Sequence, residues 1–414
     1  MTRPVSSLAA VWPLVVVLGV VVLLPVGRAS EVPVAIGAAF ALVLLARSRI
    51  DWRRDESVRL VALLFACYWM PALISGIAPV NPSKTWSTTV STLRFLPFAA
   101  FAVYAFRDAN RWTAALISIA VVVALWVIDA YVQMTTGYSL GGPAEAERLS
   151  GIFGAGNLKL GLVLAVLSPF VFIAAGDRFG WRGLVFAFVF LLVPILLAGS
   201  RAAWLMYALV CVVIAWRKAR SKGQFALAIA ACAILMACVA LLAFHDSRSF
   251  VARIDRSLLA LGGTESAVDA ASAGRLSIWH TANSMWQAHP ITGVGVRGFR
   301  YAYPTYASPK DRFVDTESDT GASHAHQIVL EVLSETGAVG LVFWLAGVAF
   351  AMRAWRRASG AARERAFAPA LALVAMTFPF NTHLAFYSAW WGLLFWWLIA
   401  LYCAALGARE DSNA

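Results

Sequence analysis

The chain has 414 residues, of which 61% are hydrophobic and only 14% are charged, and its mean hydropathy is +0.73. This composition excludes a water-soluble globular protein and indicates an integral membrane protein with many spans. The formal net charge of +12 would suggest a nucleic-acid partner in a soluble protein. Here much of the basic excess falls in short loops, where it orients membrane spans, so we expect no nucleic acid.

Apolar segments long enough to cross a bilayer follow one another along most of the chain. A hydrocarbon core about 30 Å thick needs roughly 20 residues of helix. No segment has the alternation of a membrane barrel, so we predict an all-α, polytopic membrane protein with about 12 transmembrane helices. The first could mimic a signal peptide, but a second span follows at once, so we expect a retained helix. The expected spans are 8–27, 31–47, 58–78, 86–106, 111–134, 154–175, 181–198, 201–217, 223–244, 336–355, 365–382 and 385–406.

Basic residues cluster after the second, fourth, sixth, eighth and tenth expected spans. All five clusters fall on one side, which the positive-inside rule makes cytoplasmic. Residues 1–244 then hold nine spans, residues 245–335 form a large loop outside the cytoplasm, and residues 336–414 hold three spans and a cytoplasmic C-terminus. The clusters are Arg47, Arg49, Arg53, Arg54 and Arg59; Arg107 and Arg111; Arg178 and Arg182; Arg217, Lys218, Arg220 and Lys222; and Arg353, Arg356, Arg357, Arg363 and Arg365.

The large outer loop is too long to be a passive connector. Its patterns predict helical pieces at 249–261, 274–288 and 326–336, with a glycine-rich turn at 293–298. A smaller glycine-rich outer loop covers 135–159. All five cysteines lie in apolar runs, which predicts neither a disulfide nor a thiolate metal site.

Three ionisable residues are expected near helix N-termini at the outer membrane boundary: Arg201, Arg275 and His326. Unpaired N–H groups and the helix dipole favour anions there, and the arginine fork suits phosphate oxygens. Each also has a simpler interpretation, respectively a lipid-headgroup anchor, a solvated loop charge and a helix cap. Further cations of the outer face are Arg148, Lys159, Arg297, Arg300 and Lys84.

Recurrent motifs surround these three residues, and together they resemble the O-antigen ligase family, part of a superfamily with the O-antigen polymerases. The resemblance covers about residues 200–345 and is less specific for ligase against polymerase. The first motif is Ser200-Arg201, at the start of a span. The second comprises Gly274-Arg275, Trp279, Trp286, His289-Pro290, Gly293-Val294-Gly295 and Phe299. The third comprises His326, Leu330, Glu331, Glu335 and Gly337.

The resemblance implies a glycosyltransferase of the bacterial inner membrane, related to the GT-C class. Such an enzyme transfers O-antigen glycan from undecaprenyl diphosphate to a sugar hydroxyl of the lipid A core at the periplasmic face, without a cofactor. Arg201 and Arg275 would stabilise the diphosphate and His326 would act as general base. A direct, single-step attack would invert the anomeric carbon. Secondary substrate-binding candidates are Glu331, His324 and the five further cations.

Several alternatives use the same features. An O-antigen polymerase or a protein O-oligosaccharyltransferase would use the same donor, and a membrane transporter would show repeats or broken helices instead.

The GVGVRG sequence at 293–298 fits a dinucleotide-binding pattern, but no strand precedes it. His324 and His326 are two residues apart and would point to opposite sides of one helix, and no close Cys/His group is present, so we expect no metal.

Overall fold

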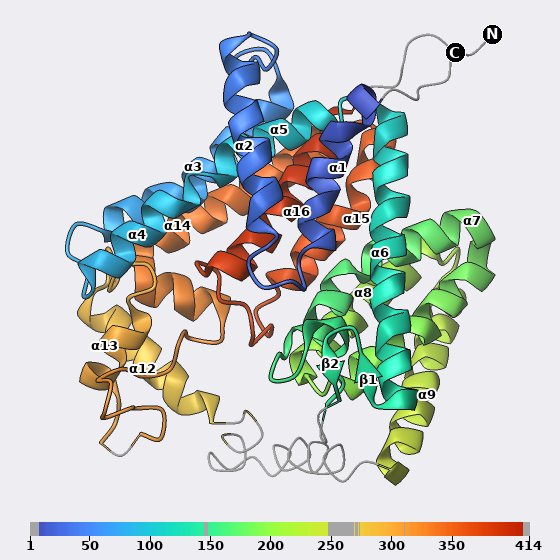
Figure 1. Ribbon diagram of the computed structural model, residues 1–414. Coiled ribbons are helices and arrows are strands. Elements are labelled where there is room, and N and C mark those ends of the chain that lie inside the picture. The colour runs from blue at the N-terminus through green and yellow to red at the C-terminus, as the bar shows by residue number, and fades with distance from the viewer. Residues whose placement is uncertain are drawn as a thin grey trace. The chain divides into compact units, whose positions relative to one another are not determined.

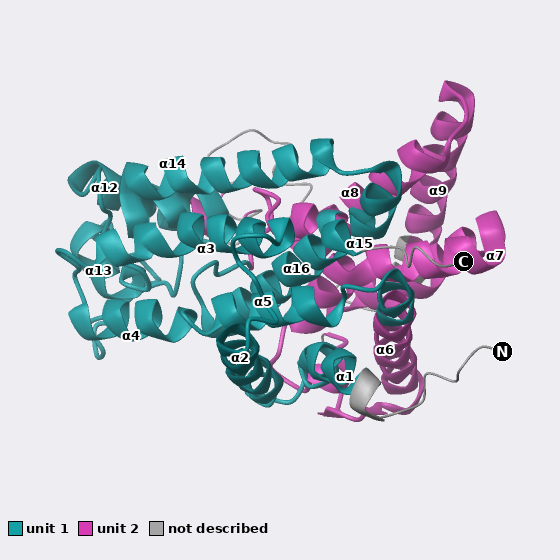
Figure 2. Ribbon diagram, turned by 90° about the horizontal axis from the view of Figure 1, so that it is seen from above, with its two compact units in different colours: residues 1–115, 277–370, 384–414 teal, residues 116–276, 371–383 magenta. Residues whose placement is uncertain are grey.

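The computed structural model describes residues 8–144, 148–246, 269, 272, 274–309 and 311–408. Helices dominate this part of the chain, which confirms the all-α prediction. The chain divides into two compact units that alternate along the sequence (Figure 2). Unit 1 comprises residues 1–115, 277–370 and 384–414, and unit 2 comprises residues 116–276 and 371–383.

Unit 1 is built on apolar helices of different lengths. They are α1 (Leu8–Val22), α2 (Glu31–Ala46), α3 (Glu56–Ser75), α5 (Phe95–Ala105), α14 (Ile328–Arg357) and α16 (Ala389–Gly407). Helix α16 packs against α3 and α5, and α3 lies along α14 (Figure 1). Trp396 and Trp397 of α16 are fully buried, and the indole of Trp397 donates to the Val17 carbonyl at 2.9 Å. The tryptophans of the final span therefore serve packing.

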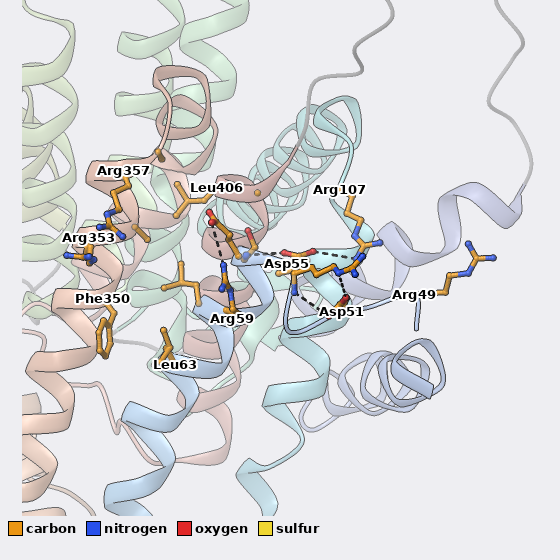
Figure 3. A pocket seen from close by; sticks show the side chains of 18 residues that line it. Arg49, Asp51, Asp55, Arg59, Leu63, Arg107, Phe350, Arg353, Arg357 and Leu406 are labelled. Carbon is orange, nitrogen blue, oxygen red and sulfur yellow. Dashed lines mark hydrogen bonds and ion pairs between the residues drawn. The ribbon is translucent and has the colours of Figure 1, made fainter. Parts of the chain in front are cut away.

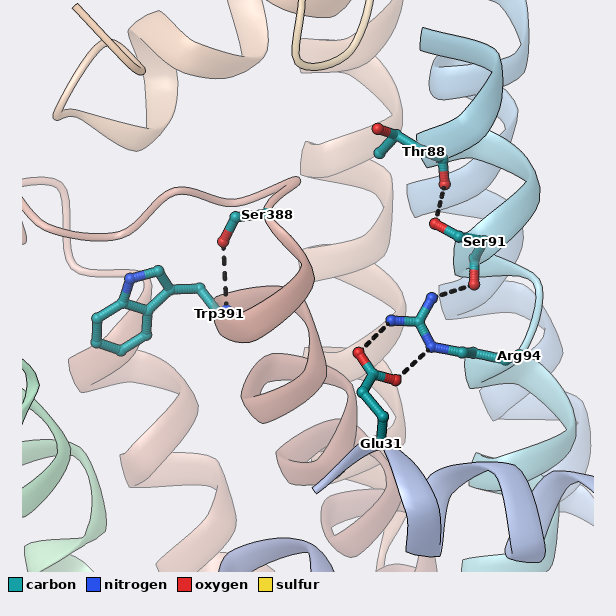
Figure 4. A network of polar contacts seen from close by, with 6 residues as sticks. All are labelled: Glu31, Thr88, Ser91, Arg94, Ser388 and Trp391. Atoms are coloured by element: carbon teal, nitrogen blue, oxygen red, sulfur yellow. Dashed lines mark hydrogen bonds and ion pairs between the residues drawn. The ribbon is translucent and has the colours of Figure 1, made fainter. Parts of the chain in front are cut away.

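The expected span 86–106 is not one continuous helix. It is divided into the polar helix α4 (Pro82–Thr92) and the apolar helix α5, with a break at Leu93 and Arg94. The Arg94 guanidinium donates to both carboxylate oxygens of Glu31, at 2.8 and 2.7 Å, and also to the Ser91 carbonyl (Figure 4). An arginine inside an apolar run needs such partners, because an unpaired charge there is costly.

The polar part of unit 1 consists of α12 (Arg275–Ala288), α13 (Phe299–Tyr306) and the start of α14. The first two residues of α12 belong to unit 2. Helix α14 bends sharply at Gly337, where φ is 65° and ψ is −163°. Residues 328–336 therefore form one arm of α14, and the residues after Gly337 form a second, apolar arm. A small core joins α12 and α13 and consists of Ile278, Ala282, Met285, Val294, Phe299, Ala302, Tyr303 and Ala325.

Unit 2 contains most of α6 (Ala109–Thr136), together with α7 (Lys159–Leu197), α8 (Arg201–Lys218) and α9 (Lys222–Asp246). The 39 residues of α7 would extend about 58 Å as a straight helix, roughly twice a bilayer core. Instead Gly180, with φ 60°, reverses the chain, and Gly161 of the first arm lies beside Ala198 at the end of the second. The two arms correspond to the expected spans 154–175 and 181–198.

The smaller outer loop is tied to the end of α6. It contains the two-residue strands β1 (Tyr138–Ser139) and β2 (Gly142–Pro143) and the 3-10 turn η1 (Gly151–Phe153). The buried Gln133 side chain accepts from the backbone N–H groups of Ser150 and Gly151, at 3.0 and 2.7 Å. Asp129 accepts from Leu140 N–H at 2.8 Å. These bonds fix a loop that would otherwise hold few apolar contacts.

Within the described residues, six helices are long and apolar enough to cross a membrane: α3, α6, α7, α9, α14 and α16. The apolar helices α1 and α2 are shorter. Helix α15 covers Gly360–Met376. The protein is thus a multi-pass helical membrane protein, while the number of twelve spans remains a prediction. The helical piece expected at 249–261 lies outside the described residues.

Candidate functional site

Arg201 is the first residue of α8, as the sequence predicts. Gly199, with φ 70°, turns the chain, and Ser200 is the N-cap, its hydroxyl accepting from Ala203 N–H at 3.4 Å. The Ser-Arg pair therefore combines a helix cap with a cation in the first turn. The N-terminal end of the helix dipole and the guanidinium both favour an anion.

Arg275 begins α12 in a similar way. The Ser272 hydroxyl accepts from Arg275 N–H at 3.2 Å, and Asp269 Oδ1 accepts from Leu276 N–H at 3.2 Å. Gly274, with φ 79°, brings the chain into the helix. The Arg275 guanidinium donates to the Ser272 carbonyl at 3.2 Å, which fixes the side chain against its own turn.

Arg201 and Arg275 belong to the same unit and interact electrostatically. Burial, followed by the positive charge of Arg201, lowers the pKa of Arg275 to about 10. Arg275 is still charged near neutral pH, so two like charges lie in a partly desolvated place. An anion that binds near both groups would relieve the repulsion between them.

Two of the secondary cations lie in the same part of unit 2. Leu149, next to Arg148, donates its N–H to the Leu197 carbonyl at 3.2 Å, four residues before Arg201. Lys159 begins α7, and Gly161 one half-turn later packs beside Ala198 and Ala203. The end of unit 2 that carries Arg201 and Arg275 is therefore strongly basic.

In unit 1 the glycine-rich turn interlocks with α14 through backbone contacts. Val294 N–H donates to the Ser334 carbonyl at 2.8 Å and Gly295 N–H to the Glu335 carbonyl at 3.0 Å. On the other side of the bend, Ala338 N–H donates to the Pro290 carbonyl at 2.8 Å. A side chain at Gly293 would collide with the backbone of Glu335 and Thr336, and one at Gly337 with that of Ile291. Gly293 and Gly337 thus allow the backbones of the glycine-rich turn and α14 to approach each other closely.

His324 and His326 do not lie on a helix, which corrects one sequence-based expectation. Helix α14 begins at Ile328 with Gln327 as its N-cap, so His326 precedes the cap, in left-handed backbone with φ 54°. The two imidazole rings lie 3.9 Å apart rather than on opposite sides. His324 is buried and its Nδ1 pairs with the Ser323 hydroxyl at 2.9 Å. Ala325 between them is fully buried in the small core, which anchors the pair.

The carboxylates of the α14 arm point into unit 1. Glu331 and Glu335 are completely buried, and Arg297 is the cation that acts on both. Arg297 N–H also donates to Glu335 Oε2 at 2.8 Å. Arg300 reaches the Thr320 hydroxyl at 3.4 Å, and Lys84 is exposed near the start of α4. Thr85, which follows Lys84, donates its hydroxyl to the Val296 carbonyl at 3.2 Å.

Residues 186–345 match the family model described as O-antigen ligase. The chain carries an O-antigen ligase domain. The match supports membership of the O-antigen ligase family and confirms the resemblance found in the sequence motifs. No curated protein matches the chain in a sequence search.

The O-antigen ligase domain extends from the second arm of α7 into the apolar arm of α14. It contains Arg201, Arg275 and His326, the first two in unit 2 and the third in unit 1. Arg148, Lys159 and Lys84 lie before it. The match supports a function of the O-antigen ligase and polymerase superfamily and an enzyme similar to glycosyltransferases.

The sequence analysis did not single out Arg94, which lies in unit 1 and precedes the matched residues 186–345. Arg94 acts electrostatically on Tyr68, which in turn lies near Glu331, Glu335 and Tyr387. A charged residue within an expected span was the available signal, and the polar sequence of α4 was a second. Among the described residues, no group of three or more His, Cys, Asp or Glu side chains is placed to hold a metal ion.

Proposed function

We propose that the protein is an O-antigen ligase of the bacterial inner membrane. It transfers O-antigen glycan from undecaprenyl diphosphate to a sugar hydroxyl of the lipid A core at the periplasmic face. The proposal includes twelve spans, both termini in the cytoplasm, residues 245–335 in the periplasm and a GT-C-like arrangement. The family match supports the class of reaction, since lipid-linked glycan and lipid A core are the general substrates of O-antigen ligases.

The observation that carries the proposal is the Arg201–Arg275 pair. Two guanidinium groups at two helix N-termini, one partly buried and repelled by the other, suit an anion with two adjacent charges. In the reaction the bond between the anomeric carbon and the diphosphate oxygen breaks, and undecaprenyl diphosphate leaves with the electron pair. The arginines stabilise the charge that develops on it. Arg148 and Lys159 add to this positive field.

The acceptor hydroxyl must lose its proton as it forms the new bond to the anomeric carbon. We assign this proton to His326, because a neutral imidazole accepts protons near neutral pH. Attack in a single step inverts the anomeric configuration. His324 positions His326 through ring contact, and Glu331 orients the α14 arm. Arg300 and Lys84 are proposed to contact the glycan, and Arg297 to balance the buried carboxylates.

Gel electrophoresis of lipopolysaccharide from a strain lacking the gene tests the proposal. Loss of all O-antigen bands, with lipid-linked polymer accumulating, is expected for a ligase. A core bearing a single repeat unit would instead identify a polymerase, and a normal ladder would contradict both. Purified protein should also transfer glycan in the presence of a chelator, whereas loss of transfer restored by one divalent metal would overturn the metal-independent mechanism.

A further inference from the structure

A second basic site lies in unit 1 at the end where α3 begins and α14 ends (Figure 3). A pocket of about 1010 Å³ opens there between these two helices, the loop before α3, the end of α5 with the residues that follow it, and the end of α16. Its lining belongs entirely to unit 1. The positive-inside rule assigns this end to the cytoplasm, whereas the O-antigen transfer is proposed at the periplasmic face. The pocket is therefore separate from the donor site.

The charges of the pocket do not balance. Six arginines and three carboxylates line it, which leaves three positive charges in excess. Three arginines lie near a carboxylate: Arg107 near Asp55 at 3.5 Å, Arg59 near Glu56 at 3.5 Å and Arg54 near Asp51 at 3.6 Å. The other three, Arg49, Arg353 and Arg357, have no ion pair within the described residues. The pocket thus suits an anion.

Apolar side chains continue from these cations along both helices. On α14, Phe350, Arg353 and Arg357 are spaced at three and four residues and so share one face. On α3, Leu63 stands one turn from Arg59. Leu63 is 47% exposed and Phe350 is 37% exposed, and in Figure 3 both lie on the same side of the arginines. A ligand here meets positive charge at one end and an apolar groove at the other.

We infer that this pocket binds an anionic phospholipid of the cytoplasmic leaflet. The phosphate lies among Arg353, Arg357 and Arg59, and an acyl chain follows the groove past Leu63 and Phe350. Basic pockets between helices on the cytoplasmic side of membrane proteins have this chemistry. A soluble phosphate compound would contact the arginines alone, whereas a phospholipid would contact the arginines and also Leu63 and Phe350, so a lipid uses both halves of the site.

Native mass spectrometry of the full-length protein in neutral detergent tests the inference. Phosphatidylglycerol is titrated against the zwitterionic phosphatidylcholine with matched acyl chains. One interfacial arginine contributes roughly fivefold to the affinity for anionic lipid. The double variant Arg353→Gln/Arg357→Gln should therefore weaken phosphatidylglycerol binding by roughly 25-fold. The control Arg356→Gln/Arg363→Gln removes the same charge from exposed positions outside the pocket and should change binding by less than about threefold.

Three results would overturn the inference. Equal binding of phosphatidylcholine would show that apolar packing alone holds the lipid. Glycerol phosphate competing at the same concentration as phosphatidylglycerol would assign the pocket to a soluble anion. Equal losses in the pocket variant and the control variant would reduce the effect to the general positive field of this end. None of these readouts depends on glycan transfer, so failure of the proposed reaction would leave them unchanged. Only the assignment to the cytoplasmic leaflet rests on the proposed topology.

Discussion

At the scale of single residues, the electrostatic interaction between Arg201 and Arg275 says most about the proposed donor site. The positive charge of Arg201 acts on the partly desolvated Arg275, and an anion bound near both guanidinium groups would relieve this repulsion. We therefore predict that Arg201→Ala and Arg275→Ala each lower the transfer rate by about 10²–10³-fold, the usual cost of losing one preorganised charge at a reacting oxygen. Transfer by purified protein from a lipid-linked donor measures this.

Two further variants separate charge from structure. Arg201→Lys and Arg275→Lys should recover only part of the rate, because an ammonium group cannot form the planar, two-pronged contact with phosphate. Arg182→Ala removes an exposed arginine from the turn of α7 in the same unit and should leave transfer unchanged. Near-normal rates in both site variants would return Arg201 and Arg275 to the roles of lipid anchor and loop charge.

His326 makes a second prediction at this scale. His326→Ala should lower transfer by about 10²–10⁴-fold, the usual contribution of a general base. His326→Asn should be equally slow while keeping the left-handed backbone at φ 54°, since asparagine tolerates that conformation and cannot take the proton. His324→Ala should cost less, because His324 acts only through its ring contact with His326. The exposed His280 provides the control: His280→Ala should be neutral.

The pH dependence of the wild type checks the same role. A general base works only when it is unprotonated, so transfer should fall as the pH decreases through the range in which imidazole ionises. The arginines stay charged throughout that range. If His326→Asn turns over normally while His324→Ala is inactive, the base is His324. If both remain active, arginine electrostatics and substrate positioning must account for the reaction.

At the scale of elements, some features follow from local sequence and others do not. The starts of α8 and α12 were predictable, because a cap and an adjacent arginine are encoded within four residues. The break at Arg94 and the reversal at Gly180 were harder, since the first depends on Glu31, 63 positions away, and the second on the packing of two arms of α7. The juxtaposition of His324 and His326 depends on the burial of Ala325 in a core built from other helices.

The glycine interlock gives a prediction at the element scale. Gly337→Ala should lower the free energy of unfolding by about 1–3 kcal/mol for the backbone conformation alone, and by more because the new methyl group meets Ile291. We expect the thermal midpoint of the full-length protein in detergent to fall by at least several degrees. Gly360→Ala, at a position with open space and no positive φ, is the matched control and should leave the midpoint unchanged. Equal midpoints for the two variants would contradict the interlock.

At the scale of the whole molecule, the division into two units was not predictable from local patterns. The chain leaves unit 1 after residue 115, returns at residue 277 and visits unit 2 again at residues 371–383. Hydropathy reports where a helix can cross a membrane but not which helices pack together. The orientation of the chain is different, because it depends on charge in short loops, which the sequence displays directly.

The orientation yields the last prediction. The basic clusters after alternate expected spans assign residues 217–222 to the cytoplasm and residues 245–335 to the periplasm. One span, α9, separates the two regions, so C-terminal reporter fusions after residues 220 and 300 should give opposite signals: a cytoplasmic reporter active at the first and a periplasmic reporter active at the second. Fusions after residue 360 should again report the cytoplasm, since the apolar arm of α14 returns the chain. Identical signals at 220 and 300 would overturn this topology, and with it the periplasmic location proposed for Arg275 and His326.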